Sequence, residues 1–415
     1  MTRRPEHPSA YRWPLPTDSP HRRLRDRVLR HTGVDLMPSD RVADRYGELL
    51  TTGDPVAERF VAEIYHGDLG PVAGRAMLER ALDEGIEAVP DAPESMRALV
   101  ADFDTLPDWA DPELIEAGAA VWRRWGYALG GVGNAGTMDT YTEGSLAVPL
   151  SLSGGYAGER ALHRYLETSR WWIEVSRPGA ITRRGSRARA ITMHVRVMHV
   201  SVRAGVRSHG EWDDERWGLP ISQSEMMLTL LGGSVGPALG LYGLGIVTSK
   251  AEIEASLHFN RYLGYLLGVR VDDIYPSTIA DGLRLLYLFD ASRSHDSGPV
   301  GAELVESFVP GFAPRGDAGL RDRLRAHFHL HLQSGYARLF MLPWNRRRYR
   351  VPVGWFGVGL LMAQLPIRIL AEIGRRLVPG VDERLQQSSV RRWERWHEWQ
   401  SERPAEFDVS AGLRR

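Results

Sequence analysis

Apolar residues recur every three or four positions through most of the chain, which is the spacing that places side chains on one face of a helix. Clear examples near the N-terminus are Val56, Phe60, Val61 and Ile64, and the run 76–82. Segments of alternating β-branched residues between turn pairs, which indicate strands, are scarce. The pattern therefore predicts an all-α fold.

The helical patterns divide the chain into three predicted regions. Residues 1–110 form an N-terminal arm, Pro-rich and extended, followed by a helical layer. Residues 111–345 form the main domain, because Asp111 and Pro112 are a typical N-cap and first residue of a helix. Residues 346–415 form a C-terminal hydrophobic segment that is rich in Arg and Trp.

Two uncharged runs, 226–249 and 351–367, have to be weighed as membrane spans. The first is rich in glycine, which favours close helix packing inside a globule. The second is short, contains Pro352 and Pro366, and follows an arginine cluster at 346–350. We expect it to form a buried hydrophobic hairpin, with contact at a membrane interface as the alternative.

The composition excludes several classes of function. Fifty-two basic and fifty-two acidic residues leave no net charge, so the basic surface of a general nucleic-acid binder is missing. The absence of cysteine excludes disulfides, cysteine zinc sites, iron–sulfur clusters and thiolate-bound or covalently attached haem. Any metal or haem must be held mainly by His, Asp or Glu. No signal peptide is readable at the N-terminus, so we expect a cytoplasmic protein, with membrane association left open.

The first candidate for chemistry is His199, in a helix predicted from about residue 187 to 207. An apolar stripe runs along this helix through Ile191, Val195, Met198, Val202 and Val206. His199 lies beside the stripe, and Arg203 follows four residues later on the same side. This pair suits haem, because a neutral imidazole can bind iron and a guanidinium can bind a propionate. The alternative is a core histidine bonded to a carbonyl, with arginines that extend to solvent.

A second helix, predicted from about residue 157 to 175, carries Arg164 and Thr168 four residues apart, with Glu167 beside them. These side chains can line a ligand pocket, where the hydroxyl would bond a ligand and the guanidinium a propionate or bound oxygen. The alternative is an amphipathic helix in which Thr168 bonds a backbone carbonyl of its own helix.

Three alternating histidines, His327, His329 and His331, offer a different chemistry. On a strand, and with a distant carboxylate, they would make a non-haem metal site. Their surroundings favour a helix, which would pair only His327 with His331. A non-haem metal enzyme is therefore a competing hypothesis.

The segment 195–203 resembles the His-x-x-x-Arg helix motif of the latex-clearing-protein and MpaB-type oxygenase family. Upstream, the segment 164–168 is similar to the Arg-x-x-Lys-Thr segment of that family. Downstream, the segments 217–223 and 262–269 resemble later parts of the family sequence. The resemblance extends over roughly residues 114–342.

This resemblance implies a globin-like helical core that holds a non-covalent haem b and cleaves C=C bonds of isoprenoids with O2. By position, His199 would be the iron ligand and Arg203 a haem or structural contact. Arg164 and Thr168 would lie on the distal side. Glu167 stands where rubber-cleaving members have a lysine, and a carboxylate cannot replace an ammonium group electrostatically. A glutamate at this position implies either an acid/base role near the iron or a side chain that points away from it. The same difference argues against polyisoprene as the substrate.

The distal catalytic glutamate of the family would correspond to Glu143 or Glu159. The resemblance implies a haem-dependent oxygenase whose partners are a small lipophilic substrate and O2. Nucleic acid is not expected, peripheral membrane contact is left open, and the oligomeric state is not determined. The competing hypotheses are a haem- or lipid-binding protein without turnover and the non-haem metal enzyme described above.

Overall fold

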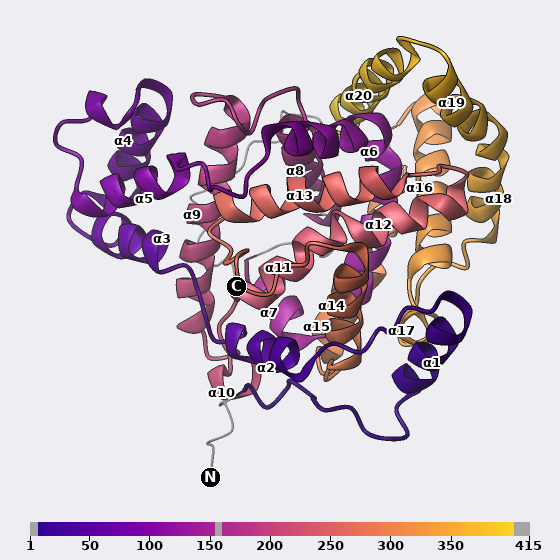
Figure 1. Cartoon of the computed structure of the whole chain (residues 1–415), viewed down its shortest axis with the longest axis horizontal. Helices are drawn as coiled ribbons and strands as arrows, with labels where there is room; N and C mark the ends of the chain where they lie inside the picture. Colours follow the sequence, from indigo (N-terminus) through magenta and orange to yellow (C-terminus); the bar gives the residue numbers. More distant parts are fainter. Residues whose placement is uncertain (1–6, 154–159, 315, 317, 402–415) are drawn as a thin grey trace.

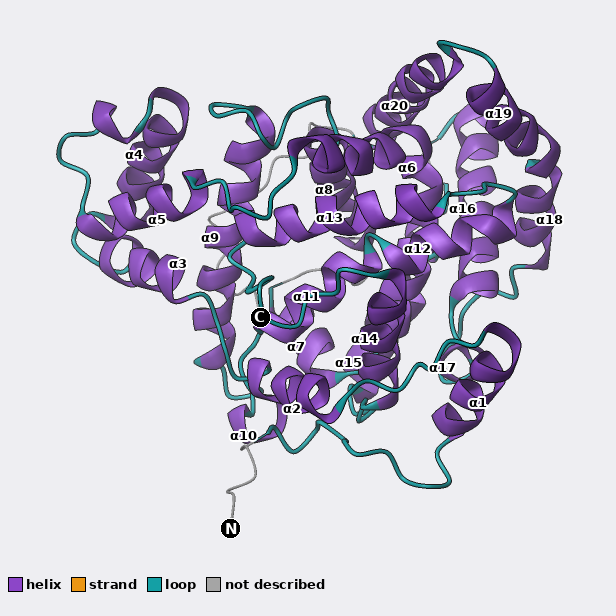
Figure 2. Ribbon diagram, viewed as in Figure 1, coloured by secondary structure: helices purple, strands orange, loops and turns teal. Residues whose placement is uncertain are grey.

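The computed structural model describes residues 7–153, 160–314, 316 and 318–401. These residues form helices and connecting loops, and no strand occurs among them (Figure 2). The all-α fold class that the apolar spacing predicts is therefore confirmed.

An N-terminal layer of helices follows the arm, whose described part contains turns at residues 9–10 and 17–18 and is therefore not the extended segment that the sequence predicts. The helices of this layer are α1 (Pro20–Thr32), α2 (Asp40–Leu49), α3 (Pro55–Phe60), η1 (Val61–Tyr65), α4 (Gly70–Glu84), η2 (Ile86–Ala88) and α5 (Glu94–Asp104). Helices α1, α2 and α3 begin after Ser19, Ser39 and Asp54, whose side chains accept backbone N–H groups of the first turn. These helices lie between residues 20 and 104, which nearly coincides with the region 22–106 where the apolar spacing predicts helices.

The central helices begin with α6 (Pro112–Thr140). Asp111 caps its N-terminus by accepting two backbone N–H groups, and Pro112 is its first residue, as predicted. The other central elements are α7 (Gly144–Leu152), α8 (Arg160–Val175), α9 (Arg187–Arg207), α10 (Asp214–Trp217), α11 (Gln223–Gly232), α12 (Val235–Gly240), η3 (Leu241–Leu244), α13 (Lys250–Leu266), α14 (Ile279–Ala291), α15 (Gly298–Phe308), η4 (Pro310–Phe312) and α16 (Leu320–Phe340). Helix α6 packs against α13 and α16. Gly118 permits this close approach, because a Cβ there would lie 2.2 Å from the carbonyl oxygen of Ala255.

The C-terminal elements are α17 (Pro343–Arg346), α18 (Trp355–Ala363), α19 (Leu365–Leu377) and α20 (Val381–Gln400). Helix α20 packs against α6 and α8, and its Trp393 and Trp396 are buried. Helices α18 and α19 lie at the end of the molecule opposite to α3, α4 and α5 (Figure 1). One cluster of buried apolar side chains extends through all three predicted regions.

Among the described residues, two segments are long and apolar enough to cross a membrane by length and composition alone, Gln223–Leu244 and Trp355–Leu377. The first is 61% buried, and a Cβ at Gly233 within it would lie 2.7 Å from the Trp172 ring. The predicted glycine packing is therefore confirmed at Gly233 and at Gly240, where a Cβ would lie 2.8 Å from Val132, but not at Gly232 or Gly243, where no described atom lies within 4 Å of such a Cβ. The second is only 17% buried. The predicted buried hairpin was wrong, because α18 and α19 contact the protein through one face and expose the other.

The buried side chain of His329 on α16 leads to a pH-dependent prediction. Its Nδ1 lies 2.8 Å from the Tyr127 hydroxyl, and burial, with a smaller contribution from Arg325, lowers its pKa from 6.5 to about 4. Between these values the unfolded chain binds the proton and the folded chain does not. The neutral His329 therefore makes its full contribution to the free energy of unfolding above pH 6.5. As the pH falls from 6.5 toward 4, this free energy decreases by up to about 1.4 kcal/mol per pH unit.

Urea unfolding of wild type and His329→Gln at pH 7 and pH 5 checks this expectation. The wild type should lose more stability than the variant on going to pH 5, because glutamine does not titrate. Equal losses in the two proteins would contradict the prediction. His31, an exposed histidine on α1, provides the matched control as His31→Gln, which should lose as much stability as the wild type.

Candidate active site

Three buried arginines at intervals of seven residues hold α9 against the N-terminal layer. Arg189, Arg196 and Arg203 lie along one side of the helix, and each is at most 5% exposed. Their carboxylate partners, at 2.7 to 2.8 Å, come from α3, its N-cap and α5, and are Asp104, Asp54 and Glu58. The seven-residue repeat of arginines along this helix was the sequence signal for the contact.

Arg203 makes a structural contact. Its guanidinium donates to the carbonyl oxygens of Pro220 at 3.0 Å and Ile221 at 2.6 Å, and it pairs with Glu58 at 2.8 Å. Ile221 has a φ of 53°, in the left-handed region that a β-branched residue rarely adopts. Arg203 therefore holds a strained turn just before α11. Of the two roles expected for this residue, these contacts favour the structural one.

His199 lies on the neighbouring side of α9. Its Nδ1 is buried and has no hydrogen-bond partner among the described residues. Burial, followed by the positive charge of Arg203, lowers the pKa of His199 to about 4. The imidazole is therefore neutral near pH 7, which is the form that binds a metal. The alternative of a core histidine bonded to a carbonyl does not match these contacts.

The apolar stripe beside His199 is buried only in part. Val195 and Val206 are buried, whereas Ile191, Met198 and Val202 are half-buried. An apolar side of a central helix that remains partly accessible is typical of a ligand pocket. The predicted buried face is thus confirmed at two positions and corrected at three.

Helix α8 turns its predicted site residues toward α9. Arg164, Thr168 and Trp171 share one side of α8, and Trp171 Nε1 donates to Thr192 Oγ1 on α9 at 3.1 Å. Thr192 and His199 are seven residues apart and share one side of α9. Arg164 and His199 each lie two turns, about 10 Å, along their helices from the Trp171–Thr192 contact. The two sets of predicted residues therefore lie on facing sides of α8 and α9.

Glu167 is 3% exposed and its carboxylate is paired on both sides. Arg164 Nη1 donates to one oxygen at 2.8 Å, and His163 Nε2 lies 3.3 Å from the other. The Thr168 hydroxyl donates to the Arg164 carbonyl at 3.1 Å, which is the contact that the amphipathic-helix alternative predicts. Glu167 therefore orients Arg164, and no free acid or base is presented by its carboxylate.

Of the two candidates for a distal catalytic glutamate, Glu143 and Glu159, the structure describes only Glu143. Glu143 is buried at the N-cap of α7, and its carboxylate accepts three hydrogen bonds from Ser294 and His295. Burial raises its pKa, although these hydrogen bonds oppose the shift. Glu143 thus connects α7 to the loop after α14. Glu159 lies outside the described residues.

The three alternating histidines lie on a helix, as their surroundings predict. The ring centroids of His327 and His331 are 6.4 Å apart, whereas His329 faces Tyr127. Among the described residues, no group of three or more His, Asp or Glu side chains is arranged to hold a metal ion. The contacts of these residues therefore do not support the non-haem site.

A second accessible surface, which the sequence analysis missed, lies on small residues of α6 and α11. Gly136 and Thr137 are exposed although α6 is a central helix, and α11 exposes Thr229 and half-exposes Gly232. A Cβ at Gly136 or Gly232 would meet no described atom within 4 Å. The two helices contact each other, so these residues border open space. The glycine-rich run 130–136 was the signal for it.

Comparison with known proteins places the chain among the oxygenases. The profile of the family described as ER-bound oxygenase mpaB/B′ and rubber oxygenase, catalytic domain, matches residues 119–371. This match covers more than half of the chain, so the chain belongs to that family, and the family indicated by the sequence motifs is confirmed.

One solved structure similar to this chain is that of latex clearing protein in the closed state. The two are 19% identical with a TM-score of 0.48, and the alignment covers 83% of this chain and 90% of the other. No curated protein matches the chain.

Proposed function

We propose that this oxygenase depends on haem b and uses O2 to oxidise or cleave a C=C bond of a small isoprenoid or other lipophilic substrate. The observation that carries the proposal is His199, a neutral imidazole with an unpartnered Nδ1 on an accessible apolar side of α9. The region 111–345 would carry the chemistry. We also propose that the protein works in the cytoplasm.

The residues present fit haem better than a bare metal ion. Haem brings four nitrogen ligands of its own, so the protein has to supply a single axial ligand. His199 offers one neutral imidazole, and no cluster of three metal-binding side chains occurs in the described part of the chain. Since the chain has no cysteine, histidine is the expected type of ligand.

When bound, haem would supply an iron centre that reacts with O2. His199 would hold that iron and would stay neutral because its pKa is low. Arg164, oriented by Glu167, would direct N–H donors and a positive charge toward an anionic oxygen or a propionate. The half-buried apolar stripe would bind the substrate and exclude water.

The proposed substrate class follows from the apolar side of α9. The half-buried Met198 and Val202 beside His199 favour a lipophilic molecule and offer no side-chain hydrogen-bond donors. Glu167 replaces the lysine of rubber-cleaving members and is already paired with Arg164. We therefore propose an isoprenoid smaller than polyisoprene.

The test is an absorption spectrum of protein produced with ample haem, followed by O2 uptake with terpenoid alkenes of increasing length. A Soret band and carbonyl products formed with O2 uptake would support the proposal. A protein without haem under these conditions would refute it. A haem protein that consumes no O2 with any alkene would favour a haem- or lipid-binding protein without turnover.

Glu167→Gln is expected to lower kcat about tenfold, because the amide oxygen can still accept a hydrogen bond from Arg164 but no longer carries the negative charge that holds the guanidinium in a buried ion pair. The Soret band and the shape of the pH–rate profile should be unchanged, since Glu167 acts by positioning Arg164. His163→Gln is the control: His163 is the exposed partner of Glu167, so this change should have little effect. Loss of one limb of the pH–rate profile in Glu167→Gln would instead identify the carboxylate as an acid or base.

A further inference from the structure

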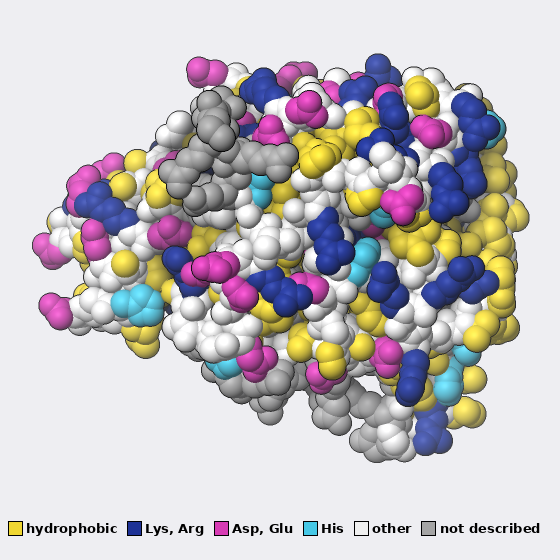
Figure 3. Space-filling model, turned by 90° about the horizontal axis from the view of Figure 1, so that it is seen from below, with side chains coloured by type: hydrophobic (Ala, Val, Ile, Leu, Met, Phe, Trp, Pro, Cys, Tyr) yellow, Lys and Arg dark blue, Asp and Glu magenta, His cyan; other side chains and the backbone are white. Residues whose placement is uncertain are grey.

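Helices α18 and α19 present a continuous apolar surface at one end of the molecule. We call it the α18–α19 face, and its most exposed side chains are Trp355, Phe356, Ile367, Leu370, Ile373 and Leu377, which are 49% to 75% exposed. In Figure 3, hydrophobic side chains gather along the edge of the molecule at this end. An exposed apolar surface of this extent indicates a binding partner.

The border of this face is positively charged. Exposed or half-buried arginines lie in the segment before α18, at Arg338, Arg346, Arg347, Arg348 and Arg350, and in the last turn of α19, at Arg376. The segment 338–381 contains one acidic residue, Glu372, whose side chain is 3% exposed and pairs with Arg375 and Arg376. The Arg338 guanidinium lies 4.2 Å from the centroid of the Trp355 ring. The face therefore presents aromatic and aliphatic groups beside positive charge without an exposed carboxylate from this segment.

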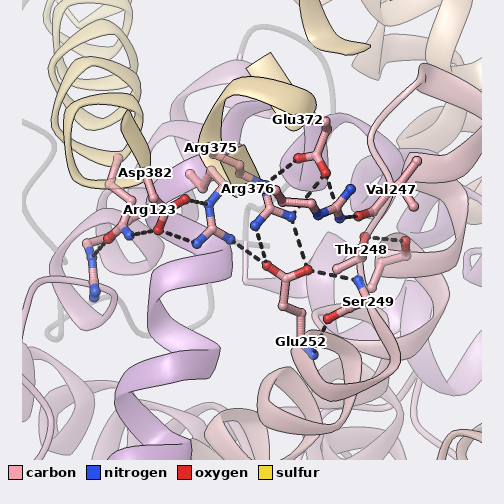
Figure 4. A network of polar contacts seen from close by, with 12 residues as sticks. Arg123, Val247, Thr248, Ser249, Glu252, Glu372, Arg375, Arg376 and Asp382 are labelled. Atoms are coloured by element: carbon pink, nitrogen blue, oxygen red, sulfur yellow. Dashed lines mark hydrogen bonds and ion pairs between the residues drawn. The ribbon is translucent and has the colours of Figure 1, made fainter. Parts of the chain in front are cut away.

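The opposite side of α19 is tied to the protein by polar contacts. Arg375 bonds Glu372 at 2.8 Å and Glu252 on α13 at 2.8 Å, and Figure 4 shows this network between α19, α13 and the start of α20. Arg124 joins it through Glu252 at 3.1 Å and Asp382 at 2.5 Å. A transmembrane orientation would carry these buried charges into lipid, at a high cost. The segment is consequently suited to lie flat with its apolar side outward.

We propose that the α18–α19 face binds the surface of a bilayer that contains anionic phospholipids, with the two helices parallel to the membrane plane. The apolar side chains enter the boundary between headgroups and acyl chains, where Trp and Phe are favoured. The bordering arginines attract the anionic headgroups. A second copy of the chain fits less well, because a symmetric contact would oppose identical arginines, and the segment 338–381 exposes no carboxylate to pair with them.

Sedimentation of the full chain with vesicles tests this proposal. The vesicles contain phosphatidylcholine alone or an equimolar mixture of phosphatidylcholine and phosphatidylglycerol. The wild type should bind the anionic vesicles more tightly, and binding should weaken as salt is added. Ile367→Ser combined with Leu377→Ser should weaken binding by at least about tenfold, because two exposed apolar side chains no longer enter the lipid. The control is Leu69→Ser combined with Val72→Ser, which changes two exposed apolar residues at the opposite end of the molecule.

A charge variant separates the contribution of the arginines to vesicle binding from that of the apolar side chains. Arg347→Gln combined with Arg348→Gln should reduce the preference for anionic vesicles severalfold and leave the weak binding to phosphatidylcholine unchanged. The proposal would be overturned if both double variants, Ile367→Ser/Leu377→Ser and Arg347→Gln/Arg348→Gln, bound anionic vesicles as tightly as the control variant. A wild type that is dimeric without vesicles and becomes monomeric in Ile367→Ser/Leu377→Ser would also overturn it, because the face would then bind a second copy.

Discussion

Replacing His199 with alanine is expected to abolish stable haem binding and O2-dependent turnover in a protein that stays folded. The side chain supplies the neutral nitrogen that would hold the iron, and alanine has no replacement for it. Since even the partners of metal ligands contribute about 10- to 100-fold to affinity, loss of the ligand itself should weaken binding by at least about 100-fold. His199 is only half-buried, so truncation should cost no more than about 1 to 3 kcal/mol of stability.

The measurement is a titration with haemin followed at the Soret band, together with O2 uptake. His194→Ala is the matched control, because His194 lies on the same helix, its pKa is also lowered by burial, and it lies 3.5 Å from Glu79 on another helix. Added imidazole should restore part of the spectrum in His199→Ala by filling the space left by the side chain. A wild-type spectrum in His199→Ala, or equal losses in both variants, would contradict the assignment of His199.

Replacing Arg196 with methionine is expected to destabilise the protein by about 3 to 5 kcal/mol, the cost of removing one partner of a buried ion pair. Arg196 is 2% exposed and forms ion pairs with Asp54 and Asp102, each at 2.7 Å. Burial lowers the pKa of the guanidinium, but the hydrogen bonds to Asp54 and the negative charges of Asp54 and Asp102 outweigh it, so the pKa is raised. Methionine retains most of the apolar volume, so the loss should come mainly from the unpaired carboxylates.

Urea unfolding of the full chain measures this effect. Arg207→Met is the control on the same helix: Arg207 and its partner Asp214 are both largely exposed, so the change should cost less than about 1 kcal/mol. Adding Asp54→Asn to Arg196→Met should recover part of the lost stability, because it removes one of the two unpaired charges. A loss in Arg196→Met as small as in the control would show that the pair does not hold α9 in place.

The local features of the helices could be read from the sequence. The bounds of α9 agree with the predicted 187–207, and the start of α6 at Asp111 and Pro112 agrees with its capping signal. The spacing of Arg164 and Thr168 placed them on one side of α8. Such features depend on residues three to seven positions apart, whose relative placement is set by helix geometry alone.

The functional assignment needed more than local pattern. The order of motifs identified the family, and the His199 motif led to the candidate axial ligand. The roles of Glu167 and Glu143 remained open, because a carboxylate can be an acid, a base or a structural partner depending on what it contacts. Both proved to be paired with groups of the protein.

Contacts between distant residues required the folded chain. Arg196 meets Asp54 and Arg203 meets Glu58 across 142 and 145 residues of sequence, and no local spacing predicts such pairs. The apolar sequence of α18 and α19 does not show whether these helices are buried or exposed, because hydropathy describes each side chain and not its surroundings in the fold. Its accessible surface, and the partly open side of α9 around His199, depend on how the helices pack against one another.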